Sequence, residues 1–120
     1  MRYLCLVHVE PGVFTALTPD ASKELDRNSL AYDRELIEKG HFIAAEALQG
    51  AESAVLVKVR SGEISATDGP FAETKEQLAG FILIEARDLN EAIRLAAGIP
   101  LARLGTIEVR PIYSIPDPGA

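Results

Sequence analysis

Residues 78–86 read LAGFILIEA and form the most hydrophobic strand candidate of the chain. In a β-strand, successive side chains point to opposite faces of the sheet. Phe81 and Leu83 therefore share one face. The other face carries Ile82 and Ile84. A strand that is apolar on both faces is typical of a sheet covered on both sides, so the pattern predicts a central strand here.

A helix is expected directly after this strand. Asp88 and Glu91 have the spacing of a capping box, in which each side chain bonds the backbone of the first helical turn. An apolar stripe follows within residues 89–96, and Gly98 marks the end of the helix. Ile107, Val109 and Ile112 then indicate a last strand.

The N-terminal part predicts the same order of elements. Residues 2–9 are apolar and rich in strand formers, and residues 10–12 read as a turn. Residues 18–20, Thr-Pro-Asp, supply an N-cap hydroxyl, a proline at the first helical position and an acid near the positive end of the helix dipole. Gly40 is the expected C-cap, and residues 41–48 the second strand.

A hairpin is predicted between the two halves. Residues 54–60 alternate valines with larger or charged side chains, and Ser61-Gly62-Glu63 connects them to a strand over residues 64–67. Residues 72–77 are polar and helix-prone. The full order is β-α-β, a hairpin, then β-α-β, which predicts a ferredoxin-like α+β subunit with its helices on one face of the sheet.

Length and composition favour one globular domain of the cytoplasm. The chain has 120 residues, of which 48% are hydrophobic, and we expect one domain over residues 1–113 with a tail over residues 114–120. The formal net charge is −6 with scattered Lys and Arg, which argues against nucleic acid and anionic membranes as partners. The one cysteine, Cys5, lies in an apolar run, so we expect its thiol to be buried. The first apolar run is too short for a signal segment or a membrane span.

The apolar second face of the sheet predicts a partner. A monomer would expose one of the two alternating sets of residues 78–86. Large exposed apolar patches usually mark interaction surfaces. We therefore expect a homodimer that is joined through the sheet face.

Residues 67–81, TDGPFAETKEQLAGF, resemble the YCII-related family, in the branch named for its DGPF motif. The likeness extends to residues 1–6, 40–48 and 108–112. It implies a ferredoxin-like subunit of a dimeric α+β barrel, in which two sheets face each other across a two-fold axis. The wider superfamily contains lactone isomerases and monooxygenases of small aromatic molecules, whereas the function of the DGPF branch is mostly unassigned. Fold transfers here better than activity does.

The DGPF run holds the first candidate site residues. Asp68 can accept backbone N–H bonds in a turn that Gly69 and Pro70 shape, and this alone accounts for an aspartate. The alternative is a site, with Asp68 as a catalytic group. The candidate ligand-binding residues around it are then Phe71, Glu73 and Lys75.

Two further residues are candidates for catalysis. Glu46 lies in a strand among small apolar residues, where a carboxylate points to solvent, to a partner or into a cleft. An ion pair with Lys75, Lys58 or Arg110 explains it equally well. His8 shares a strand face with leucines and titrates in the range that suits acid–base catalysis. A structural histidine is the alternative.

No motif predicts a cofactor. The two histidines and the cysteine have unrelated spacings, so we expect no metal site, and glycine-rich phosphate loops are missing from the sequence. Two functions remain open. The protein is a homodimeric accessory or regulatory module that binds a small molecule, which we favour because no nucleophile–base pair is visible. Alternatively, it is a lyase or isomerase, in which His8 or Asp68 moves a proton and Glu46 orients the substrate.

Overall fold

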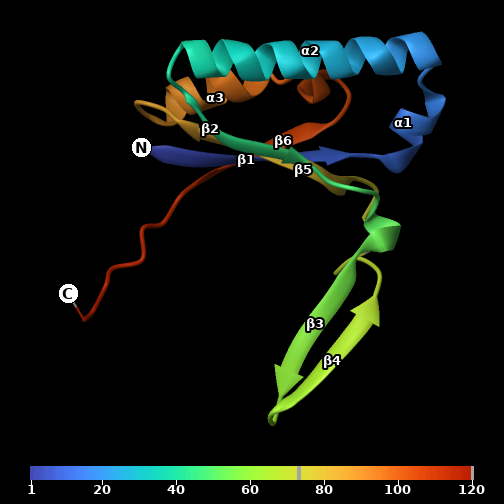
Figure 1. Ribbon diagram of the computed structural model, residues 1–120, viewed down its shortest axis with the longest axis vertical. Coiled ribbons are helices and arrows are strands. Elements are labelled where there is room, and N and C mark those ends of the chain that lie inside the picture. Colours follow the sequence, from blue (N-terminus) through green and yellow to red (C-terminus); the bar gives the residue numbers. More distant parts are fainter. Residues whose placement is uncertain (73, 120) are drawn as a thin grey trace.

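The computed structural model describes residues 1–72 and 74–119 and has the ferredoxin-like α+β architecture. A four-stranded antiparallel sheet has the order β2-β5-β1-β6, and the two longest helices cover one of its faces (Figure 1). A separate hairpin, β3–β4, extends from one end. The elements are β1 Arg2–Val9, α1 Pro11–Ala16, α2 Pro19–Glu38, β2 Phe42–Ala47, η1 Ala51–Ser53, β3 Val55–Arg60, β4 Glu63–Asp68, β5 Gln77–Glu85, α3 Leu89–Ala97, η2 Pro100–Arg103 and β6 Thr106–Pro111.

The predicted central strand is confirmed as β5, which lies between β1 and β2. Its residues Ile82 and Ile84 are buried beneath the helices, together with Cys5 of β1. Phe81 and Leu83 lie on the opposite face and are only half-buried. We call this opposite side of the four-stranded sheet the open face.

The predicted helix boundaries are confirmed by their caps. The Thr18 hydroxyl accepts a hydrogen bond from the N–H of Ala21 (3.1 Å) at the start of α2. At its end, Gly40 has a φ of 78°, a left-handed conformation that glycine adopts without strain. The Asp88 carboxylate accepts from the N–H of Glu91 (2.9 Å) at the start of α3. Capping interactions within one turn therefore fix both ends of α2 and the start of α3.

Two local expectations were wrong. Residues 10–12, read as a turn, lead into the short helix α1, because a proline at the first helical position is pre-organised for a helix and Val13 donates to the carbonyl of Glu10 (3.0 Å). Residues 72–77, read as helix-prone, contain no helix in their described part. There the Thr74 hydroxyl donates to the carbonyl of Glu76, and such side-chain bonds compete with helical ones.

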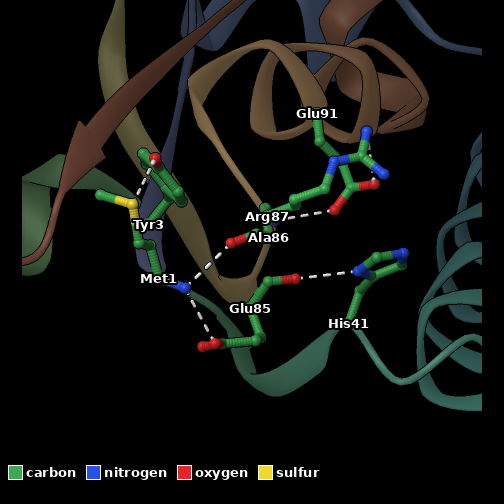
Figure 2. Close-up of polar contacts among 7 residues, drawn as sticks. All are labelled: Met1, Tyr3, His41, Glu85, Ala86, Arg87 and Glu91. Carbon is green, nitrogen blue, oxygen red and sulfur yellow. Dashed lines mark hydrogen bonds and ion pairs between the residues drawn. The ribbon is translucent and has the colours of Figure 1, made fainter.

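The end of the sheet farthest from the hairpin is fastened by polar contacts (Figure 2). The terminal amine of Met1 donates to the carboxylate of Glu85 (2.9 Å) and to the carbonyl of Ala86 (2.9 Å). Nδ1 of His41 lies 2.9 Å from the carbonyl oxygen of Glu85. These contacts tie the first residue and the loop after α2 to the end of β5.

The hairpin β3–β4 forms an arm, which we define as residues 55–68. Its two-residue loop, Ser61-Gly62, has φ values of 51° and 77°. Two positive φ values are typical of the type I′ turn that joins tightly twisted strands. The arm and the C-terminal tail both extend from the sheet on the side opposite the helices (Figure 1). No helix among the described residues is long and apolar enough to cross a membrane.

Candidate functional site

Two cavities adjoin the four-stranded sheet. The first, about 480 Å³, lies between α2, η2 and the sheet, and we call it the helix-side cavity. The second, about 500 Å³, lies between the end of β1, the β2–β3 connection and residues 70–72 and 74–78, and we call it the arm-base cavity. Both volumes lie in the range that holds small-molecule ligands.

One face of α2 forms a wall of the helix-side cavity. Asp26, Ser29, Leu30 and Asp33 line it. The last three lie three, four and seven residues after Asp26, which places all four on one side of a helix. Opposite them the sheet contributes small and apolar residues, and residues 99–101 close one end.

Two glycines leave room around this cavity. A Cβ on Gly80 of β5 would lie 2.7 Å from the carbonyl oxygen of Glu46, so only glycine allows β2 to approach this closely. A Cβ on Gly98 would lie 2.4 Å from the hydroxyl of Tyr32. That hydroxyl donates to the carbonyl of Leu95 (2.5 Å), which holds the Tyr32 ring against the end of α3. The glycine at position 80 thus allows the close approach of β2, and the glycine at position 98 leaves space for the Tyr32 ring.

The helix-side cavity has an acidic lining. Among the described residues, the charged side chains on the helix side are those of Asp26 and Asp33, and no basic residue lines the cavity. Glu46 also borders the cavity, but it pairs with Phe81 of β5, so its side chain points to the open face. Burial raises the pKa of the half-buried Asp33 above its usual value. Burial, and then the carboxylate of Glu35, also raise the pKa of Tyr32. The arrangement offers hydrogen-bond acceptors and negative charge to whatever enters.

The arm-base cavity is more apolar and contains His8. Leu56, Phe71 and Leu78 line it beside the imidazole. Nε2 of His8 lies 3.0 Å from a carboxylate oxygen of Glu108 on the neighbouring strand β6. A histidine with a carboxylate partner is one arrangement that supports proton transfer.

The structure separates the three candidates for catalysis. His8 lines the arm-base cavity, Glu46 lines the helix-side cavity, and Asp68 lines neither. Of the candidate ligand-binding residues, Phe71 lines the arm-base cavity. Lys75 lines neither cavity, and its ammonium lies 3.3 Å from a carboxylate oxygen of Glu10 rather than beside Glu46. Glu73 lies outside the described residues.

Asp68 ends β4 and is exposed. The turn after it depends on Gly69, whose φ is 103° and whose N–H donates to the carbonyl of Ala54 (2.8 Å). Within residues 1–72 and 74–119, the Asp68 carboxylate accepts no hydrogen bond. Glycine and main-chain bonding therefore account for the geometry of the described turn.

Sequence reasoning missed two residues that the structure brings into the sites. Asp33 carried a readable signal, because it lies seven residues after Asp26, which places both side chains on one side of a helix. Glu108 carried none, because its position beside His8 depends on the pairing of β1 with β6. No group of three or more His, Cys, Asp or Glu side chains in the described part of the chain is arranged to hold a metal ion.

Comparison with known proteins supports both fold and family. A family model described as the YCII-related domain matches residues 1–116. An uncharacterized protein of Rhizobium meliloti, R00369, is 34% identical over 114 residues, which cover 93% of this chain and 92% of the relative. The structure of 5-chloro-2-hydroxyhydroquinone dehydrochlorinase from Burkholderia phenoliruptrix, in complex with 2,5-dihydroxybenzoquinone, is similar with a TM-score of 0.57. At 17% identity over 94% of each chain, this last similarity concerns the fold alone.

Proposed function

Because the chain belongs to the YCII-related domain family, and its relative R00369 is uncharacterized, we propose a function from the chemistry of the site. The protein binds a small cyclic molecule in the helix-side cavity, as a homodimeric accessory or regulatory module. The ligand carries hydroxyl or amine donors, or a positive charge. The observation that carries this proposal is the lining, in which every charged residue is acidic.

The lining accounts for both affinity and selectivity. Apolar residues of the sheet and η2 give a ring a surface to pack against. Asp26 and Asp33 disfavour anions and favour donors, because like charges repel in a partly enclosed site. A neutral dihydroxylated ring such as catechol has the size and the hydroxyl donors that such a cavity accepts.

The proposed homodimer uses the open face. Leu4, Leu6, Phe81 and Leu83 lie there, and each is only half-buried within one chain. A second open face would complete the burial of these side chains. A stable interface of this kind buries about 1,200 Å² or more in total. Light scattering at micromolar concentration should give about twice the chain mass of 12.9 kDa.

The ligand proposal is tested with three probes of matched size. We expect benzylamine and catechol to raise the Tm, and benzoate to leave it unchanged, because only benzoate brings a negative charge to the acidic lining. A ligand that binds only the folded state, present at a hundred times its Kd, raises the free energy of unfolding by about 2.7 kcal/mol and therefore raises the Tm. Asp33→Asn should remove most of the benzylamine shift. Equal stabilisation by benzoate would contradict the proposal.

The matched control is Glu24→Gln, which removes the same charge from α2 outside the cavity lining. This variant should keep the full benzylamine shift. If Glu24→Gln and Asp33→Asn behave alike, the binding depends on the overall charge of the protein and the proposed site is wrong.

A second candidate function, isomerisation by proton transfer, is favoured by one observation. Burial raises the pKa of Asp33 and so makes its carboxylate a stronger base than an exposed one. Asp33 would take a proton from one carbon of the ligand and return it to another, a sequence that balances without a further reactant. Consumption of a bound probe that Asp33→Asn abolishes would favour this candidate over binding alone.

A further inference from the structure

The arm has one apolar and one polar face. Its register places Val57 opposite Ala66 and Val59 opposite Ile64, so these side chains share a face. Val57 is 65% exposed and Ile64 is 76% exposed. We call this side, completed by Val55 and ending in Asp68 at the base of the arm, the valine face. The other side carries Leu56 at the base and then polar residues, Lys58, Arg60, Glu63, Ser65 and Thr67.

The arm is not covered by the rest of its own chain. Its two strands pair only with each other. Leu56 at its base is half-buried, and every other residue from 55 to 68 is exposed. A two-stranded hairpin without a third layer is marginally stable in water. The valine face therefore needs a surface outside this chain.

The size of the exposed surface indicates how large that contact is. The chain exposes 8570 Å². A compact monomer of this mass exposes about 6,300 Å². The radius of gyration is 16.8 Å, whereas a compact chain of this length has about 13.6 Å. The excess of roughly 2,300 Å², to which the arm and the extended C-terminal tail both contribute (Figure 1), exceeds the 800 Å² or so that each partner buries in a standard interface.

We propose that the valine face packs against a second copy of this chain, so that each arm of the proposed homodimer clasps the partner's sheet. This inference rests on the homodimer proposed above. The arm extends on the same side of the molecule as the open face (Figure 1). Between the arm and the open face lie the exposed side chains of Phe71 and Leu78, which line the arm-base cavity. In a two-fold interface the valine face of each chain then meets the open face of the other.

The dimensions of the arm fit this occupant. A strand of six residues is about 20 Å long. Four paired strands span about 15 Å between the outer two. An arm that starts at one end of the open face is therefore long enough to lie across the whole sheet of a partner.

The test is the oligomeric state of two arm variants at micromolar concentration. Val57→Asp places a charge on the valine face and should weaken the dimer by about tenfold or more in dissociation constant, since an unpaired buried charge is costly. Ser65→Asp, the matched control, places the same charge on the polar face opposite Lys58 and should stay dimeric. An unchanged Val57→Asp dimer would overturn the role of the arm and leave the homodimer standing. A monomeric wild type would overturn both.

Hydrogen exchange on the wild-type protein provides a second test that needs no substitution. Amides of residues 55–68 should exchange faster when the protein is diluted from above to below the dissociation constant of the dimer, because dissociation exposes the arm to solvent. Arm amides that exchange equally fast in dimer and monomer would contradict the proposal. The benzylamine shift should persist in Val57→Asp, because one chain forms the helix-side cavity. Failure of the ligand proposal is thereby distinguished from failure of the arm proposal.

Discussion

Nε2 of His8 lies 3.0 Å from Oε1 of Glu108, and this contact joins β1 to β6 on the open face. Their side chains are 28% and 46% exposed, so water screens the pair. A double-mutant cycle of His8→Ala and Glu108→Ala, measured on the dissociated monomer, should give an interaction energy of about 0.2–1 kcal/mol in the free energy of unfolding. The benzylamine shift should survive His8→Ala, because His8 lines the other cavity. If His8→Ala abolishes the increase in Tm caused by benzylamine, His8 contributes to the binding site and the assignment of the ligand to the helix-side cavity is wrong.

Asp33 should make stability depend on pH in a defined direction. Burial raises its pKa in the folded state, so the native protein binds this proton more tightly than the unfolded chain. Protonation of Asp33 therefore stabilises the folded state, and this stabilisation is complete below the pKa of an aspartate in the unfolded chain, about 3.9. It is lost as the pH rises through the higher, folded pKa. Asp33→Asn should therefore raise the Tm at pH 7 relative to wild type, and this gain should disappear in acid, as measured by thermal unfolding at both pH values.

Gly98→Ala should disturb the helix-side cavity through Tyr32. The new Cβ would lie 2.4 Å from the Tyr32 hydroxyl, which has to move and lose its bond to Leu95. We expect a loss of about 1–3 kcal/mol in the free energy of unfolding. Gly12→Ala is the control, because a Cβ there meets nothing within 4 Å and α1 gains helix propensity. If both variants are equally stable in urea unfolding, Tyr32 is not held as described.

Gly69→Ala should cost stability for a different reason. No atom lies within 4 Å of the added Cβ, but the φ of 103° is a conformation that alanine rarely adopts. We expect a loss of about 1 kcal/mol or more. Ligand shifts should be unchanged, since Gly69 lines neither cavity. Unaltered unfolding in urea would show that the turn does not need glycine.

Cys5 should be unreactive in the folded protein. It is completely buried in β1, and burial raises the pKa of its thiol to about 11. At pH 8 almost no thiolate forms, and the thiolate is the reactive species. A disulfide reagent such as dithionitrobenzoate should label the thiol only as fast as the protein unfolds. Rapid stoichiometric labelling of the native protein would contradict this burial.

Local patterns predicted most of the fold because they specify the main chain directly. Thr18, Gly40 and Asp88 act within one turn of their own positions, so the helix boundaries were readable. The two-sided apolar strand predicted the centre of the sheet for the same reason. The helix α1 escaped prediction, because Pro11 followed by Gly12 is equally suited to a turn.

The sites were less predictable because they depend on strand order and on the packing of α2. His8 and Glu46 are both strand residues, and their separation into two cavities follows from the placement of helices and arm. Glu108 reaches His8 only through the register of β1 and β6. Asp33 lies in a helical sequence whose other charged residues are exposed. The spacing puts Asp33 on the same side of the helix as Asp26, but it does not show that this side borders a cavity.

The acidic helix-side cavity is the central claim, and chemical-shift mapping tests it most directly. Benzylamine, catechol and benzoate are each titrated to millimolar concentration into ¹⁵N-labelled protein. We predict that the first two shift the amide resonances of Asp33, Glu46 and Leu101, all of which line the cavity, and that benzoate does not. Shifts confined to the arm-base residues His8 and Leu78, or no shifts from benzylamine and catechol, would contradict the account.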